Sequence, residues 1–548
     1  MSRAGRDSGR DTFDVVVVGA GSAGCVLAAR LSEDPALQVL LLEAGGSDRT
    51  LEVQVPAGLY KTFRTRWDWN YTTEPQPAAA GRPRFWPRGK MLGGSSSINA
   101  MVYMRGAAAD YDEWAELTGD DRWSYRSVLP VFRRSEDNAR GASEFHGAGG
   151  PLRVEDLRTV HPWTAALVES AVAAGHPHTD DFNGPSQFGV GLHQVTQRRG
   201  RRWSAADAFL HPAAGRPNLT VRTGAHATRV LLDGTRATGV EYRHEGRLRT
   251  AHASAEVVVS SGAVNSPQLL MLSGIGPGAH LREVGVDVRH ELPGVGSGLQ
   301  DHPLVPTIWT VRSGRSLLHG EGPVGYAQWF GARRGPLTSN LAEAGQFARS
   351  RPELADADLQ YMYLPVKFWR QAEVDPDVDA FTACTVLVRV ESRGSVRLRS
   401  ADPSWAPAID AGYLTDDRDL EALVTGMEIV RDIAATGPLA AVLDQEWRPG
   451  RAVTTRDGLR QAAREDLESL YHPTSSCRMG TDGMSVVDPE LRVHGLQGLR
   501  VVDASVMPTL VRGNTNAPTI MIAERAADLL RASLGSAAQP VHADLAMS

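Results

Sequence analysis

A glycine-rich segment near the start of the chain has the residue types and spacing of a dinucleotide-binding site. Gly19, Gly21 and Gly24 form a G-x-G-x-x-G pattern, and Glu43 follows about twenty residues later. In such a site the first glycine permits a tight turn, the second lets a pyrophosphate approach the backbone, and the third lets a helix pack closely on a strand. A helix N-terminus stabilises the phosphate charge, and an acid meets a ribose hydroxyl. The alternative is a glycine-rich turn that binds no ligand.

The elements around these glycines support the cofactor interpretation. Residues 13–18 are a β-branched run that is typical of a buried parallel strand, and apolar residues at helical spacing follow the glycines. Residues 38–42 predict a second strand that ends at Glu43. Both NAD and FAD fit this unit, whereas Glu43 argues against NADP, because an acid there repels a 2′-phosphate.

Two further segments contain small residues that bring backbone close to a polar ligand. Residues 87–101 read PRGKMLGGSSSINAM, in which successive backbone N–H groups can form an anion-binding nest. Residues 257–276 predict a buried strand, a turn, and a helix that Ser266 caps and Pro267 opens. Taken singly, each segment is compatible with an ordinary turn.

Together these segments resemble the glucose–methanol–choline (GMC) family of FAD-dependent alcohol oxidoreductases, and in particular its choline dehydrogenase-like and alcohol oxidase-like flavoproteins. The resemblance extends over about residues 13–530. It also includes the following segments: 183–184, 300–303, 392–395, 471–480 and 501–519.

The resemblance implies a discontinuous α/β, Rossmann-like FAD-binding domain and an interleaved α+β substrate domain built on an antiparallel sheet. We expect residues 13–155, 200–300 and 473–535 in the FAD-binding domain, and residues 156–199 and 301–472 in the substrate domain. Residues 1–12 and 536–548 are expected to be flexible tails.

The resemblance also assigns the chemistry. His472 matches the family's active-site histidine, so it is expected to accept the alcohol proton while the substrate carbon delivers hydride to flavin N5. An imidazole suits this role because its unperturbed pKa lies near neutrality. Asn516 matches the family's second position, where an amide orients the substrate oxygen. The alternative for Asn516 is a cap of the helix that Pro518 indicates.

By the same resemblance, FAD contacts are expected at Gly19, Gly21, Ser22, Ala23, Gly24, Glu43, Ala44, Leu92, Gly93, Gly94, Ser95, Asn99, Met101, Val102, Asp503, Ala504, Asn516 and Thr519. Some choline-oxidising members attach FAD covalently through a histidine in the first signature. Ile98 occupies the matching position here, so non-covalent FAD is predicted.

The substrate is expected to be a primary alcohol. Tyr471, Trp67 and Trp69 could surround a quaternary ammonium group by cation–π attraction, and they suit a benzylic or furanic alcohol equally well. Phe368 and Trp369 lie in an Asp- and Pro-rich excursion, residues 353–379, that is expected near the pocket. The alternative is that these aromatic residues pack beneath a surface loop. Choline-like and aryl alcohols both stay open at this stage, and so do O2 and a quinone-like acceptor for the electrons.

Three other functions compete with alcohol oxidation. A family-related lyase keeps FAD and splits a cyanohydrin without net redox, as hydroxynitrile lyases do, and a family-related photodecarboxylase acts on fatty acids in light. A flavin-binding protein without turnover is the third. The His–Asn pair favours alcohol oxidation over the lyase and the photodecarboxylase.

Composition narrows the remaining possibilities. The 548 residues include 58 Lys+Arg and 64 Asp+Glu, a net charge of −6 that provides no basic footprint for nucleic acid. Three cysteines argue against a disulfide scaffold and against a structural zinc site. No signal-peptide core and no apolar stretch long enough to span a bilayer is visible, so a cytoplasmic location is expected. His176 and His178 beside two aspartates read as a polar loop, and no metal is expected.

Overall fold

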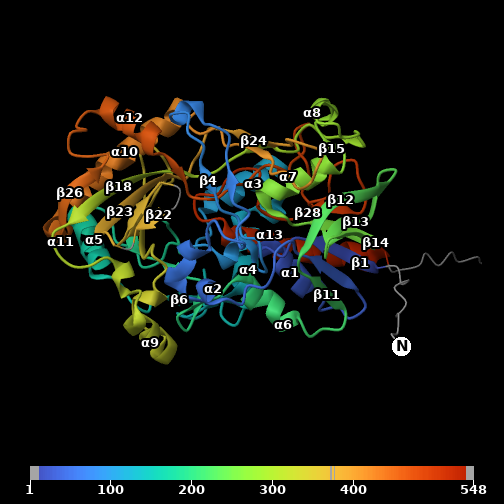
Figure 1. The fold of residues 1–548 in the computed structure, drawn as a ribbon, viewed down its shortest axis with the longest axis horizontal. Helices are drawn as coiled ribbons and strands as arrows, with labels where there is room; N and C mark the ends of the chain where they lie inside the picture. Colours follow the sequence, from blue (N-terminus) through green and yellow to red (C-terminus); the bar gives the residue numbers. More distant parts are fainter. Residues whose placement is uncertain (1–10, 371–372, 376, 538–548) are drawn as a thin grey trace, which may run out of the picture.

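Two seven-stranded sheets organise the described part of the chain, one toward each end of its long axis (Figure 1). The computed structural model describes residues 11–370, 373–375 and 377–537. The first sheet lies toward the right of Figure 1 and the second toward the left. Helix α13 (Asn516–Ala537) begins near the centre and extends toward the end that holds the first sheet. The predicted combination of a Rossmann-like sheet and an antiparallel sheet is confirmed.

The first sheet is parallel in its centre, with the order β11-β2-β1-β14 and β28 paired to the far side of β14. Its strands are β1 (Thr12–Val18), β2 (Val39–Leu42), β11 (Leu219–Arg222), β12 (Ala225–Asp233), β13 (Arg236–His244), β14 (Arg247–Val259) and β28 (Leu499–Val501). β12 and β13 form an antiparallel extension. The continuous Val/Leu runs of β1 and β2 are buried because helices cover both faces of a parallel sheet.

The second sheet is antiparallel throughout, with the order β26-β18-β23-β20-β19-β7 and β27 paired to β18. Its strands are β7 (Gly189–Leu192), β18 (Pro303–Val311), β19 (Ala344–Ala348), β20 (Leu359–Leu364), β23 (Ala380–Leu387), β26 (Leu443–Arg448) and β27 (Glu468–Ser469). The predicted excursion 353–379 therefore contributes a central strand, β20, as well as the hairpin β21 (Lys367–Trp369) and β22 (Glu373–Asp375).

Helices cover both sheets and connect them. They are α1 (Ser22–Leu31), α2 (Leu51–Gln54), α3 (Ala108–Thr118), α4 (Tyr125–Ser135), α5 (Pro162–Ala173), α6 (His211–Ala213), α7 (Gly262–Leu272), α8 (Gly278–Glu283), α9 (Pro323–Ala332), α10 (Asp417–Ala434), α11 (Gly437–Val442), α12 (Arg456–Asp466) and α13. In Figure 1, α10, α11 and α12 lie at the end of the molecule that holds the second sheet.

Helix α7 corrects one prediction, because it begins at Gly262 and contains both Ser266 and Pro267. Pro267 lacks the N–H that would bond to the carbonyl of Ala263. The Oγ of Ser476 donates to that carbonyl instead, at 2.6 Å. A hydrogen bond from a distant segment thus lets the helix tolerate an internal proline.

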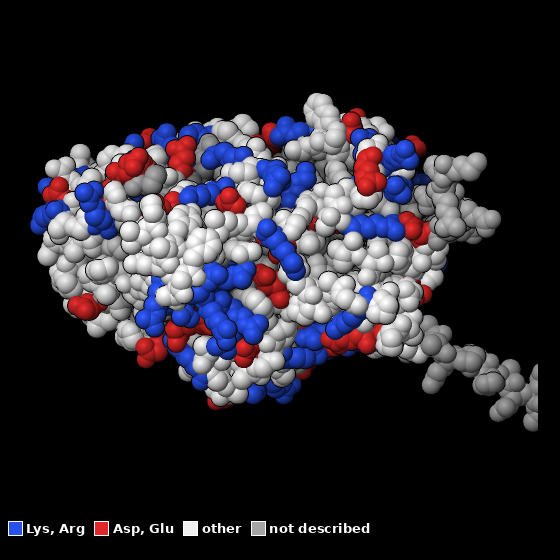
Figure 2. All heavy atoms as spheres, turned by 60° about the horizontal axis from the view of Figure 1, so that its bottom comes forward, with Lys and Arg blue, Asp and Glu red and all other residues white. Residues whose placement is uncertain are grey.

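The described residues include parts of both expected tails. β1 begins at Thr12 and α13 ends at Ala537, so the described chain reaches slightly into both expected tails, while residues 1–10 and 538–548 lie outside the described residues. No helix among the described residues is both long and apolar enough to cross a bilayer. On the face drawn in Figure 2, Lys and Arg side chains lie among Asp and Glu side chains over most of the surface.

Candidate active site

A cavity of about 300 Å³ lies between the two sheets and is lined by residues of both. On the first sheet it lies beyond the carboxyl ends of β1, β2, β14 and β28, which is where ligands bind in open α/β sheets. The predicted cofactor residues that line it are Gly19, Gly21, Ser22, Ala23, Glu43, Ala44, Gly94, Ser95, Asn99, Met101, Val102, Asp503, Ala504, Asn516 and Thr519. Gly24, Leu92 and Gly93 are not among the lining residues.

In the glycine loop after β1, Gly24 packs tightly against the protein backbone, whereas the Cα of Gly21 faces open space. A Cβ atom on Gly24 would lie 1.8 Å from the carbonyl oxygen of Gly19, so only glycine lets α1 start this close to β1. A Cβ on Gly21 would meet nothing within 4 Å, and Gly21 lines the cavity. The open side therefore leaves the backbone accessible to a pyrophosphate at the N-terminus of α1, and the loop fits a dinucleotide.

Glu43 closes this loop from the end of β2. Its Oε2 accepts a hydrogen bond from the backbone N–H of Ala20 and its Oε1 from that of Gly45, both at 2.8 Å. Burial raises the pKa of Glu43 to about 7, and the two N–H donors oppose that shift. Each carboxylate oxygen keeps a second lone pair, which is available to a ribose hydroxyl.

Asp503, after β28, is held by the start of α7. Its Oδ2 accepts from the backbone N–H of Gly262 at 2.9 Å and from the hydroxyl of Ser266 at 2.5 Å. The carboxylate thus balances the positive end of α7. Asp503 and Ala504 both line the cavity, so the predicted cofactor contact there stays a prediction.

His472 lies on the cavity wall with each ring nitrogen near a different partner. Its Nδ1 lies 2.9 Å from Nδ1 of His302, and its Nε2 lies 3.4 Å from Nδ2 of Asn514. The separation of 3.4 Å is long for a hydrogen bond, as is common in active sites without substrate. Gln360 donates to Oδ1 of Asn514 at 3.2 Å, and this bond orients the amide nitrogen toward His472.

These contacts define one hydrogen-bonding chain. An amide nitrogen can only donate, so Nε2 of His472 is the unprotonated nitrogen and Nδ1 carries the hydrogen that His302 accepts. Burial lowers the pKa of His472 well below its usual value, and His302 and Arg88 lower it further. Burial lowers the pKa of His302 to about 3. Both rings are therefore neutral, and the lone pair of Nε2 of His472 is directed toward Asn514 on the cavity wall.

The structure places a different asparagine beside His472 than the one that the sequence predicts. Asn514, two residues before the predicted Asn516, contacts the His472 ring. Asn516 is the first residue of α13, and its Oδ1 accepts from the hydroxyl of Ser22 at 2.7 Å, in the glycine loop. Both asparagines occur in the stretch 513–516, and the start of α13 decides which one faces the histidine.

Asp301 and Arg88 support the segment that carries His472, and neither was assigned a role from the sequence. Oδ1 of Asp301 accepts from the backbone N–H of His472 at 2.6 Å, and its Oδ2 accepts from the hydroxyls of Ser469 and Tyr413. Arg88 donates to the carbonyl of Tyr471. The pattern 300–303 was noticed in the sequence, but nothing local shows that it pairs with residues 469–474.

The predicted aromatic residues separate into two groups. Tyr471, which precedes His472, and Phe368 both line the cavity. Trp69 lines it elsewhere, stacked on Tyr71 near His226, while Trp67 and Trp369 are not among the lining residues. Trp369 packs against Trp447 instead. A cage of Tyr471, Trp67 and Trp69 around a quaternary ammonium group is therefore not present in this structure.

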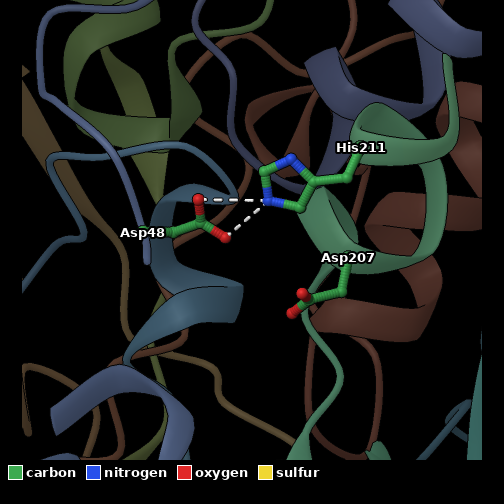
Figure 3. A group of neighbouring side chains, drawn as sticks. All are labelled: Asp48, Asp207 and His211. Atoms are coloured by element: carbon green, nitrogen blue, oxygen red, sulfur yellow. Dashed lines mark hydrogen bonds and ion pairs between the residues drawn. The ribbon is translucent and has the colours of Figure 1, made fainter. Parts of the chain in front are cut away.

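One cluster outside the cavity has the composition of a metal site. Asp48, Asp207 and His211 bring ligand atoms within 4.8 Å of one another (Figure 3). The residues already contact protein partners: His211 Nε2 lies 2.9 Å from Oδ2 of Asp48, and Asp207 accepts hydrogen bonds from Ser204. The predicted polar loop contributes a loose contact between His178 and Asp180, at 3.8 Å.

Comparisons with known proteins agree with this geometry. The GMC oxidoreductase family models match residues 13–304 and 390–523. An alcohol dehydrogenase [acceptor] of Pseudomonas putida is 44% identical over 94% of this chain and 95% of its own length. Human mitochondrial choline dehydrogenase is 43% identical over 97% and 91%. The crystal structure of a pyridoxine 4-oxidase from Mesorbium loti superposes with a TM-score of 0.87 at 33% identity, over 95% and 99%. The chain therefore belongs to the GMC oxidoreductase family.

Proposed function

We propose that this protein binds FAD without a covalent bond and oxidises an alcohol to an aldehyde or ketone, with His472 as the base. The observation that carries the proposal is the position of Nε2 of His472. This nitrogen of a neutral, buried imidazole lies 3.4 Å from Asn514, and both residues line the cavity that the glycine loop also lines. Two of the relatives, an alcohol dehydrogenase and a choline dehydrogenase, support the same reaction class.

The residues present fit FAD. The open side of Gly21 receives the pyrophosphate, Glu43 receives the ribose, and the cavity extends from there to His472. Bound FAD supplies the hydride acceptor, N5 of its isoalloxazine ring. Ile98 lines the cavity at the position where covalent members carry histidine, which supports a non-covalent complex. Acid precipitation should leave the flavin in the supernatant, and flavin in the pellet would contradict this.

Each polar group beside His472 has a defined task during oxidation. Nε2 of His472 accepts the hydroxyl proton of the alcohol while the hydride leaves the same substrate's carbon, so an aldehyde or ketone results. Nδ2 of Asn514 donates to the substrate oxygen and fixes its orientation. His302 accepts the Nδ1 hydrogen and holds His472 in the tautomer that can act as a base.

An anaerobic reduction experiment tests the proposal. The purified holoenzyme is mixed with a panel of alkyl and benzylic alcohols, and bleaching of the flavin absorbance reports oxidation. The His472→Ala variant should keep its yellow colour and be reduced about 10² to 10⁴ times more slowly, the usual range for loss of a general base. Cyanide release from a cyanohydrin, or light-dependent CO2 release from a fatty acid, without bleaching by any alcohol would contradict the proposal.

The electron acceptor is tested on the same preparation. Rapid mixing of the reduced enzyme with O2 or with a soluble quinone measures which of them reoxidises the flavin during turnover. Fast reoxidation by O2 assigns an oxidase, and fast reoxidation by the quinone alone assigns a dehydrogenase.

A further inference from the structure

One face of the second sheet forms the floor of the cavity on the His472 side. Side chains alternate along a strand, so Gln360, Met362 and Leu364 of β20 point to the same face. Gln360 is the residue that contacts Asn514. Met362 and Leu364 therefore lie on the same face of the sheet as Gln360, progressively farther along β20, and both line the cavity.

The strand register extends this floor across two neighbouring strands. Met362 pairs with Cys384 of β23, and Leu304 of β18 belongs to the row that contains Gln360. Cross-strand partners share a face, and Cys384 and Leu304 both line the cavity. The floor is thus made of thioether, thiol and aliphatic side chains, all at most 8% exposed.

The walls above the floor are mostly apolar, although Asn340 and Ser469 also line the cavity. They consist of side chains from the 3-10 segment Pro56–Thr62 and the residues that follow it, from the β21–β22 hairpin, and from the segment before His472. These lining residues are Leu59, Tyr60, Phe63, Phe368, Val374, Leu470 and Tyr471.

The charged residues of the lining disfavour a cationic substrate. The acids among the described lining residues are Glu43 and Asp503, and both carboxylates are held by backbone N–H groups at the glycine loop and at α7. On the His472 side, the charged lining residue is Arg88, whose guanidinium donates to the carbonyls of Pro87 and Tyr471. A substrate cation there would lose its hydration and meet no carboxylate among the described lining residues, and the Arg88 cation lies in the same wall.

We propose that the substrate is an uncharged alcohol whose chain is hydrocarbon, and that the cavity discriminates against choline-like alcohols. The inference rests on the proposed function, because it names the substrate of the same site. Burial of an apolar chain against this floor provides the binding energy, and the hydroxyl group is held by His472 and Asn514.

A pair of alcohols that differ only in charge tests the proposal. Choline and 3,3-dimethylbutan-1-ol have the same shape, with nitrogen replaced by carbon. In anaerobic mixing with the holoenzyme, the apparent Kd for flavin reduction should be at least about 10-fold lower for the uncharged alcohol. An equal or lower Kd for choline would overturn the proposal.

A binding measurement keeps this test independent of turnover. Calorimetric titration of the His472→Ala holoenzyme compares the two alcohols under conditions in which neither is consumed. The uncharged alcohol should again bind more tightly. If it does, while no alcohol bleaches the wild-type flavin, the substrate-pocket inference stands and the proposed oxidation fails. If choline binds more tightly, the inference fails whatever the redox result.

A matched pair of variants then locates the discrimination. Met362→Glu introduces a carboxylate into the floor, and Met362→Gln introduces the same shape without charge. The Glu variant should move the ratio of the two Kd values toward choline by about 10-fold or more, and the Gln variant should leave the ratio near its wild-type value. Flavin content and unfolding temperature monitor folding, and Leu364→Asp with Leu364→Asn provides a second pair. An unchanged ratio in folded acidic variants at both positions would overturn the inference.

Discussion

The Nδ1 atoms of His302 and His472 lie 2.9 Å apart, although the two residues are 170 positions apart in the chain. The pairing of β18 with β27 brings them together, and the carboxylate of Asp301 holds the backbone N–H of His472. A neutral ring behind the proposed base accepts its hydrogen and thereby selects its tautomer. His302 is therefore a positioning residue that acts through His472.

Replacing His302 should separate this positioning role from simple packing. His302→Leu removes the acceptor, and we expect the rate of flavin reduction to fall about 10²-fold, as for a misplaced catalytic group. His302→Asn keeps an acceptor oxygen and should recover most of that loss. Wild-type reduction rates in both variants would show that the ring only fills space.

The two asparagines near the start of α13 should respond differently to truncation. Asn514 contacts His472, so Asn514→Ala should slow flavin reduction about 10²-fold or more, as loss of an oriented donor does. Asn516 contacts Ser22 of the glycine loop, so Asn516→Ala should weaken FAD binding and leave the reduction rate of the saturated enzyme near wild type. Stopped-flow reduction and fluorescence titration of the apoprotein with FAD measure the two effects. The opposite assignment would restore Asn516 as the catalytic partner.

Substitutions of Gly21 and Gly24, in the glycine loop after β1, should separate an effect on FAD binding from an effect on folding. Gly21→Ala adds a methyl group that meets no protein atom within 4 Å, so the unfolding temperature of the apoprotein should change little. FAD affinity should fall, because the methyl group occupies the space of the pyrophosphate. Gly24→Ala places its methyl group 1.8 Å from the carbonyl oxygen of Gly19, so it should destabilise the protein itself. Wild-type FAD affinity in Gly21→Ala would contradict the proposed site.

A buried ion network away from the cavity predicts a loss of stability at alkaline pH. Burial lowers the pKa of His146, but hydrogen bonds to Asp181 at 2.8 Å and Glu136 at 2.9 Å raise it to about 9. A histidine with a raised pKa stabilises the fold below its unfolded value near 6.5, and that contribution, on the order of 2 kcal/mol, is lost as the pH rises through about 9. The unfolding temperature of the holoenzyme should therefore fall more between pH 6 and 9.5 than that of His146→Gln. Parallel curves for the two proteins would exclude this role of His146.

The sequence by itself determined the features that depend on local backbone chemistry. The β-branched run before Gly19, the spacing of Gly21 and Gly24 and the acid at Glu43 specify a turn, a close helix and a place for a dinucleotide, because absent Cβ atoms and strand propensity act on neighbouring residues. The same local reasoning placed the start of α13 near Pro518. It failed at α7, where Ser476 satisfies the carbonyl that Pro267 leaves free.

Only the tertiary structure decided which side chains meet in the cavity. Asn514 and Asn516 are the same residue type and lie two positions apart. Asn514 precedes α13 and contacts His472, whereas Asn516 is the first residue of α13 and contacts Ser22. Trp67, Trp369 and Phe368 are all aromatic, but only Phe368 is among the residues that line the cavity. Trp369 packs against Trp447 instead. Local sequence carries no information about which segments, hundreds of residues apart, come into contact in the folded chain. The candidate active site consists of residues from such segments.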